Sequence, residues 1–202
     1  CIPRSTRLFE ATSEYIASLN PERDLDARIL ECHARRALEI LSSGEAEIGV
    51  IRFRAEYRDY FEEQTAQREL SLQILSKYRY VLILPQSHPL AERPAIRMSE
   101  LEGFAEIVHG DNLRAHGRQQ NVACRKIYTV DRMAQLTLLQ RLPGAYMWGP
   151  EMPEAFVERW GLVQRTCLDN QTVYHNAIIL HPRYVMTEIE SGYVQHILEN
   201  CK

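Results

Sequence analysis

A run of five apolar residues at 80–84, YVLIL, passes directly into PQSHPLA at 85–91, and this junction constrains the fold more than any other stretch. The run is long enough for a buried strand and too short for a buried helix. Proline ends such a strand, because it fixes its own φ and has no N–H to donate to a sheet. We therefore expect a deeply buried strand that stops at a small rigid turn.

Strand-like and helix-like segments alternate on both sides of this run. Before it, the pattern predicts strands at residue 2, 25–29, 47–53 and 70–74, and helices at 8–19, 34–41 and 54–69. After it, strands are predicted at 104–108, 126–130, 145–148, 162–167 and 172–180, and helices at 113–122, 131–141, 154–160 and 185–199. Alternation of this kind predicts two successive α/β units with crossover connections.

The composition excludes several classes of protein. With 202 residues and 45% apolar content, the chain can bury a core. Its net charge of −3 means that it lacks the excess of positive charge needed to bind a nucleic-acid backbone by itself. No apolar run approaches the roughly 20 residues of a membrane helix. The five cysteines are scattered and form no C-x-x-C pair, which is typical of a reducing cytoplasm. The chain begins with Cys1 rather than Met, so we expect it to be a piece of a longer protein.

Sequence motifs for catalysis or metal binding are sparse. There is no G-x-S-x-G elbow and no glycine-rich phosphate loop. His88 lies in the rigid turn without a neighbouring partner, so we interpret it as a packing or turn residue. His109, Asp111 and His116 in HGDNLRAH have metal-like content but no evident fourth ligand, and Asp111 or Asn112 would serve equally well as a helix cap. We predict no catalytic residue, no metal and no cofactor.

Loops that follow a strand and precede a helix carry the best binding candidates. At such places helix N-termini present free N–H groups and a partial positive charge, and nearby arginines favour an anion such as a carboxylate. The alternative is that the arginines are solvated surface charges, while acidic residues in the same loops would fit a zwitterion. The predicted ligand contacts are Arg4, Ser5, Thr6, Arg52, Phe53, His109, Gly110, Asp111, Tyr128, Val130, Asp131 and Trp148.

Four segments, in order and spacing, resemble the effector-binding domain of LysR-type transcriptional regulators. They are SSGEAEIGVI at 42–51, YVLILPQSHPLA at 80–91, IRMSELEGFAEIV at 96–108 and VDRMAQLTLLQRLPGAYMWGP at 130–150. The HPLA sequence at 88–91 is the most specific of these, and the match extends over nearly the whole chain. The chain departs from the family pattern at Glu47 and Glu100, where aspartate is usual, and at 142–145, where a Gly-x-Gly turn is usual.

The resemblance implies a fold similar to type 2 periplasmic binding proteins, with two mixed sheets flanked by helices and joined by two crossover strands. Lobe I would comprise residues 1–83 and 177–202, and lobe II residues 84–176, with a ligand cleft between them. The crossovers would be 78–84 and 172–180. The helix-turn-helix that precedes such a domain in the family is absent from this chain.

The implied function is the ligand-sensing domain of a bacterial cytoplasmic regulator. Its partners would be a small anionic or zwitterionic effector, a second copy of the chain, and DNA only through the missing domain, with no membrane. Phe9 and Tyr15 lie outside the core stripe of their helix and are predicted to face the second copy. The alternatives are a free-standing solute-binding protein of a transporter, which has the same fold, and an enzyme on the same scaffold.

Overall fold

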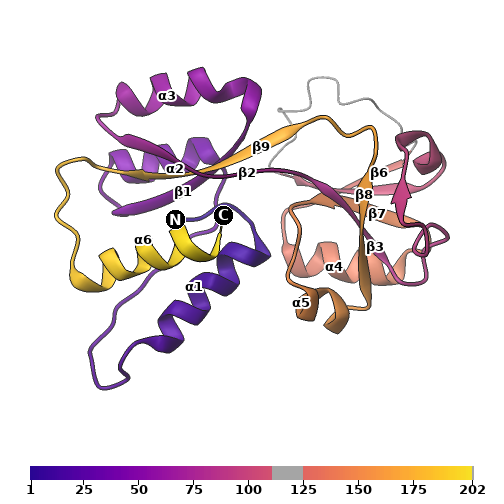
Figure 1. Ribbon diagram of the computed structural model, residues 1–202, viewed down its shortest axis with the longest axis horizontal. Coiled ribbons are helices and arrows are strands. Elements are labelled where there is room, and N and C mark those ends of the chain that lie inside the picture. The colour runs from indigo at the N-terminus through magenta and orange to yellow at the C-terminus, as the bar shows by residue number, and fades with distance from the viewer. Residues whose placement is uncertain (111–124, 202) are drawn as a thin grey trace. The chain divides into compact units, whose positions relative to one another are not determined.

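The computed structural model describes residues 1–110 and 125–201 (Figure 1). The chain divides into two compact units, unit 1 comprising Cys1–Tyr78 and Thr172–Lys202, and unit 2 comprising Arg79–Gln171. Each unit has its own sheet, of three strands in unit 1 and six in unit 2. Both sheets are flanked by helices, so the α/β fold with two mixed sheets is confirmed. The predicted lobe boundaries lie a few residues further along the chain than these unit boundaries.

Unit 1 is built on the strand order β1-β9-β2, with β1 and β9 antiparallel. Its strands are β1 (Ile48–Arg54), β2 (Ser71–Arg79) and β9 (Val173–Leu180). Its helices are α1 (Thr6–Ser18), α2 (Ala34–Ser42), the 3₁₀ turn η1 (Ala55–Tyr57), α3 (Arg58–Ala66) and α6 (Glu188–Asn200).

The sheet of unit 1 has a separate apolar core on each face, because successive strand residues point to opposite sides. Ile51 and Phe53 of β1 pack with α2 and α3 on one face. Val50 packs with Leu8 of α1 and Ile197 of α6 on the other. Figure 1 shows α1 and α6 side by side on this second face.

The predicted strand at 25–29 is wrong. Ile2 forms a parallel bridge to Glu31, and its N–H donates to the Leu30 carbonyl, so pairing begins only where the predicted strand ends. Residues 21–30 are exposed throughout, including Leu25 and Ile29. Alternating apolar residues therefore occur here without a neighbouring strand to pair with.

Unit 2 has the strand order β4-β8-β3-β7-β5-β6, which mixes parallel and antiparallel pairs. Its strands are β3 (Val81–Pro85), β4 (Ala95–Ile96), β5 (Ala105–His109), β6 (Arg125–Thr129), β7 (Ala145–Gly149) and β8 (Leu162–Cys167). Its helices are the 3₁₀ turn η2 (Met98–Leu101), α4 (Arg132–Arg141) and α5 (Glu154–Arg159). The helix predicted at 113–122 lies outside the described residues.

The YVLIL run is confirmed as a strand from Val81 onward and as buried from Leu82 onward, whereas Tyr80 lies just before β3. Within β3, Leu82, Ile83 and Leu84 are almost completely buried and lie in the middle of the sheet, between β7 and β8. Ile83 packs under α4 and α5, whereas Leu82 and Leu84 pack on the opposite face with η2. A strand in this position must be apolar on both faces, which explains the unbroken run.

The PQSHPLA segment folds into two consecutive turns after β3. The His88 N–H donates to the Pro85 carbonyl (2.9 Å), and the Ala91 N–H donates to the His88 carbonyl (2.8 Å). The His88 ring is buried against Phe104, with ring centroids 4.5 Å apart, and its Nδ1 accepts from the Leu90 N–H (3.0 Å). His88 is thus a packing and turn residue, as predicted.

Replacing Gly144 with alanine should destabilise the chain by about 1–3 kcal/mol, the range of strained or overpacked substitutions. Gly144 has φ +74°, and a Cβ there would lie 2.7 Å from Cδ1 of Phe104. Gly103→Ala is the matched control, because Gly103 has φ +84° but open space around the added Cβ. Chemical denaturation measures both. An equal loss in the two variants would show that backbone strain alone accounts for the effect.

None of the helices in the described part of the chain is both long and apolar enough to cross a membrane.

Candidate functional site

The N-terminus of α1 is the first part of the candidate site. Ser5 is the N-cap, and its side chain accepts from the Leu8 N–H at 3.4 Å. Ser5 and Thr6 are both buried, 4% and 8% exposed. The first turn of a 13-residue helix presents N–H groups with a partial positive charge. This end of α1 is suited to an anion.

Arg52 on β1 lies beside this helix end. Its Nη1 donates to the Arg4 carbonyl (2.8 Å), and its Nε donates to the Tyr78 hydroxyl (2.5 Å) and to Oδ1 of Asn176 (3.3 Å). The Tyr78 hydroxyl in turn donates to Oδ1 of Asn176 (2.9 Å), and Nδ2 of Asn176 donates to Ser76 (3.2 Å). We call Arg52, Tyr78, Asn176 and Ser76 the polar ladder. It connects all three strands of the sheet in unit 1.

Two further residues continue the ladder along the sheet. Arg54 pairs with Tyr174 in the register of β1 and β9, and the rings of Tyr174 and Tyr78 are stacked with centroids 6.3 Å apart. Burial lowers the pKa of the Arg54 guanidinium, but interactions with Tyr174 and Glu56 outweigh it and the pKa is raised. Arg54 therefore remains charged, on the same face of β1 as Arg52.

Phe53, predicted as a ligand contact, is not part of this group. Its side chain points to the opposite face of β1, where it stacks on Phe61 with ring centroids 4.7 Å apart. It is 4% exposed and belongs to the core between β1 and α3. Adjacent strand residues alternate in direction, so Arg52 and Phe53 face different sides of the sheet.

In unit 2, the structure brings together the predicted residues at the ends of β5 and β6. His109 pairs with Thr129 in the parallel register, and the His109 ring contacts the Val130 carbonyl through Nε2 (2.8 Å). Gly110 adjoins Val130, since a Cβ at Gly110 would lie 2.8 Å from Cγ1 of Val130. Tyr128 and Val130 are exposed, 45% and 60%. Their apolar surface is available for a further contact.

Asp131 and Trp148 have structural partners of their own. Asp131 is the N-cap of α4, and its carboxylate accepts from the Ala134 N–H (2.7 Å). Trp148 on β7 packs edge-on to Tyr146 and against the core on the η2 face. Burial raises the pKa of Tyr146 well above its usual range, and the nearby Glu106 carboxylate adds to this effect. Asp111 lies outside the described residues.

The metal hypothesis gains no support from the part of the chain that the structure describes. Within residues 1–110 and 125–201, no group of three histidine, cysteine or acidic side chains could hold a metal ion. Asp111 and His116 of the HGDNLRAH segment lie outside these ranges.

Sequence reasoning missed Tyr78 and Asn176 as partners of Arg52, and Ser76 and Tyr174 as further members of the same network. Each is separated from Arg52 by 24 residues or more, so the network arises from strand pairing rather than from a local motif. A weak signal exists, because the polar pair His175 and Asn176 directly precedes the apolar end of β9 at 177–180.

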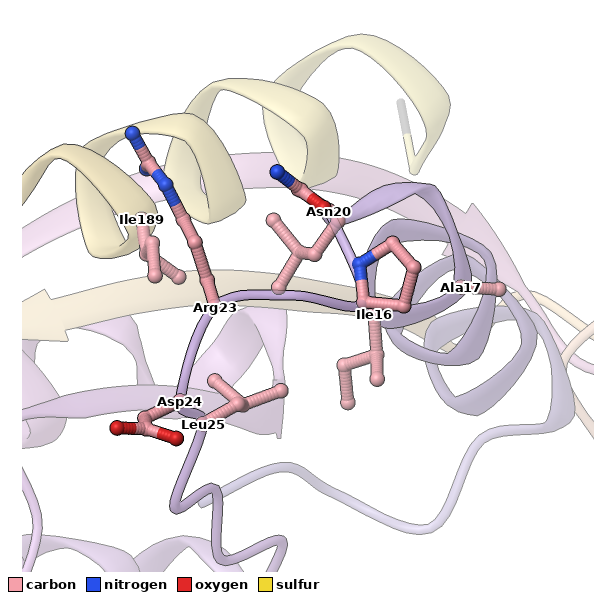
Figure 2. A pocket seen from close by; sticks show the side chains of 9 residues that line it. Ile16, Ala17, Asn20, Arg23, Asp24, Leu25 and Ile189 are labelled. Carbon is pink, nitrogen blue, oxygen red and sulfur yellow. The ribbon is translucent and has the colours of Figure 1, made fainter.

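A pocket of about 450 Å³ lies elsewhere in unit 1, and no predicted ligand contact lines it. It is formed by the end of α1, the exposed loop after it and Ile189 of α6 (Figure 2). Arg23 of its rim is paired with Glu188 (3.3 Å), both exposed to solvent. The candidate site is therefore defined by converging polar groups at the opposite end of α1, not by this pocket.

The stability of the chain should fall as pH is lowered from 7 towards 5, partly through His88. Burial lowers the pKa of His88, while the Gly144 carbonyl acts in the opposite direction. A histidine whose folded pKa is depressed contributes stability above its unfolded pKa, about 6.5, and loses it as pH falls below that value. Protonation would also remove the Nδ1 acceptor that Leu90 uses.

His88→Asn keeps an acceptor for the Leu90 N–H but does not titrate, so denaturation across pH should show a flatter profile. His175, whose pKa burial also lowers, continues to titrate in this variant. A variant with the parent's pH profile would contradict the role of His88.

Comparison with known proteins agrees with this architecture. A model of the LysR substrate binding domain matches residues 21–172. No curated protein matches the chain. The effector-binding domain of QuiR in complex with shikimate superposes with a TM-score of 0.64 at 11% identity, covering 98% of this chain and 93% of that one.

Two further structures have the same fold. The regulatory domain of MetR from N. meningitidis has a TM-score of 0.63 at 16% identity, with 98% and 91% of the two chains covered. A transcriptional regulator from Vibrio parahaemolyticus has a TM-score of 0.66 at 18% identity, with 99% and 92% covered. At these identities the structures establish the fold, and the family model establishes membership. The chain belongs to the LysR substrate-binding domain family and is a ligand-sensing regulatory domain.

Proposed function

We propose that this domain senses a small anionic metabolite bound at the N-terminus of α1. The observation that carries the proposal is the position of Arg52, whose guanidinium is hydrogen-bonded to the Arg4 carbonyl immediately before the Ser5 cap. A permanent cation and a helix N-terminus at the same place both favour negative charge.

The neighbours of Arg52 strengthen the case for an anion. Three groups that accept hydrogen bonds from its guanidinium, a main-chain carbonyl, a phenol and an amide, are neutral. These three hydrogen bonds do not themselves neutralise the positive charge. A carboxylate bound here would gain charge-assisted hydrogen bonds, which are about twice as strong as neutral ones.

The proposed contacts in unit 1 are Arg4, Ser5, Thr6 and Arg52; Phe53 is left out because it lies in the core. For unit 2 we propose His109, Gly110, Tyr128, Val130, Asp131 and Trp148, supported by the exposed apolar surface of Tyr128 and Val130. Apolar contacts of this kind would suit the hydrocarbon part of a metabolite.

We further propose that the domain acts in the cytoplasm without catalysing a reaction, as part of a regulator that binds DNA through another domain. Membership in the LysR substrate-binding domain family supports this proposal. The two regulators compared above, from N. meningitidis and Vibrio parahaemolyticus, have the same fold. The bound metabolite would favour one of two pre-existing conformations of the regulator.

We expect the chain to form a homodimer, which sedimentation at high micromolar concentration can detect. Phe9 of α1 is 43% exposed and is suited to this contact. Tyr15, also predicted for it, is instead used within the chain: its hydroxyl donates to the Ile189 carbonyl (2.6 Å), and its ring packs on Tyr193 of α6. A purely monomeric chain would contradict the expectation.

A thermal-shift screen of small carboxylic acids tests the proposed function. Shikimate is the first candidate, because the QuiR domain is bound to it and it carries a carboxylate. A ligand present at 100 times its Kd stabilises a domain by about 2.7 kcal/mol, which raises the melting temperature measurably. Neutral and cationic analogues should have no effect. Stabilisation by cationic metabolites alone would overturn the assignment of an anion site.

A further inference from the structure

Arg52 contacts three segments of unit 1 that are far apart in the sequence. One acceptor, the Arg4 carbonyl, belongs to the residue before the cap of α1. The second, the Tyr78 hydroxyl, belongs to the last residue before the chain enters unit 2. The third, Oδ1 of Asn176, belongs to β9, four residues after the chain returns to unit 1 at Thr172. One guanidinium therefore contacts the helix start and both strands through which the chain passes between the units.

The bonds around Arg52 differ in length, which indicates where the network can yield. The contact to the Arg4 carbonyl is 2.8 Å, whereas that to Oδ1 of Asn176 is 3.3 Å. Oδ1 of Asn176 also accepts from the Tyr78 hydroxyl at 2.9 Å. Because Asn176 keeps this second donor, the guanidinium can leave the amide oxygen without exposing a buried acceptor.

We propose that Arg52 is a positioning residue that couples anion binding at the start of α1 to the strands β2 and β9. The inference rests on the proposed function for the identity of the site. An anion at α1 attracts the guanidinium more strongly than the neutral Asn176 oxygen does. Binding of the anion therefore replaces the contact between Arg52 and Asn176 by a contact between Arg52 and the anion. By thermodynamic linkage, any change in β2 and β9 at Tyr78 and Asn176 changes the affinity for the anion equally.

Amide hydrogen exchange on the unliganded 202-residue chain tests the coupling directly. In Arg52→Lys, the charge remains, but an ammonium group cannot reproduce the fork of Nε and Nη1 donors. We expect exchange to speed up about tenfold, the effect of losing one or two hydrogen bonds, in the first turn of α1 and in β2 and β9 together. Amides of Leu38 in α2 and Ile197 in α6, both buried in unit 1, should keep the parent's rates.

Arg36→Lys is the matched control, since Arg36 is a half-exposed arginine of the same unit, bonded to Glu39 rather than to the ladder. Arg36→Lys should leave amide exchange unchanged in the first turn of α1 and in β2 and β9. Asn176→Ala alone should speed exchange in β2, in β9 and, through Arg52, in the α1 turn. In an Arg52→Lys background it should no longer affect the α1 turn. Faster exchange throughout unit 1, or in only one of the segments, would show that Arg52 is merely structural and would overturn the inference.

This experiment needs no ligand, so its outcome is separate from that of the proposed function. If the acid screen yields no ligand, the proposed function fails while the exchange result still decides the coupling. If a ligand is found but the α1 turn and the two strands respond independently to Arg52→Lys, the anion site stands and the coupling through Arg52 is wrong.

Discussion

Glu106→Gln is expected to destabilise the chain by about 2–3 kcal/mol, somewhat less than the roughly 3–5 kcal/mol for a fully buried pair. Glu106 lies on β5 beside Lys126 of β6, with 3.4 Å between carboxylate and ammonium. Their side chains are 12% and 18% exposed, so the variant would leave an ammonium group with little water to solvate it. Urea denaturation at neutral pH measures the loss.

Two further variants show whether the loss of stability comes from the unpaired Lys126 charge or from substitution of a glutamate in general. Glu106→Gln combined with Lys126→Met should recover much of the loss, because no unpaired charge remains. Glu188→Gln removes an exposed ion pair with Arg23 and should change stability much less, since exposed pairs contribute little. If the Glu106 and Glu188 variants lose equal stability, the buried pair has no special role.

Thr6→Ala and Ser5→Ala are expected to weaken binding of the metabolite about tenfold or more, the effect of losing a hydrogen bond to a charged oxygen. Ser5→Ala should also cost about 1 kcal/mol of stability, because it removes the cap of α1. Isothermal titration calorimetry with the acid found by screening measures the affinity.

Ser13→Ala is the matched control for this pair. Ser13 lies on the exposed face of the same helix and donates to the Phe9 carbonyl (2.8 Å), away from the N-terminus. Parent-like affinity in Ser5→Ala and Thr6→Ala would place the ligand elsewhere.

The sequence predicted those elements whose pattern reflects burial on a defined face. The strand at 80–84 and the helices α1, α2 and α4 follow from apolar spacing together with caps and breakers, as at Ser5 and Asp131. The apolar alternation at 25–29 was misleading because it has no neighbouring strand. The last helix begins at Glu188 rather than 185, since Thr187 and Glu190 form a capping box there.

The candidate site was only partly predictable for a different physical reason. Ser5, Thr6 and Arg52 could be found because they occupy loops or strand ends next to helix starts. Tyr78 and Asn176 join Arg52 only through the pairing of β1, β9 and β2, which no local spacing reveals. The sequence alone could have excluded Phe53 from the candidate site. Phe53 faces the opposite side of β1 from its neighbour Arg52 and the same side as the buried Ile51, two residues earlier.

Amide chemical shifts recorded during titration with the metabolite test the central claim most directly, because they locate the bound anion. We predict that the largest shifts occur at the amides of residues 6–8 in the first turn of α1 and at the N–H groups of the Arg52 guanidinium. Shifts confined to residues 16–25 and 189, around the pocket at the other end of α1, would contradict it.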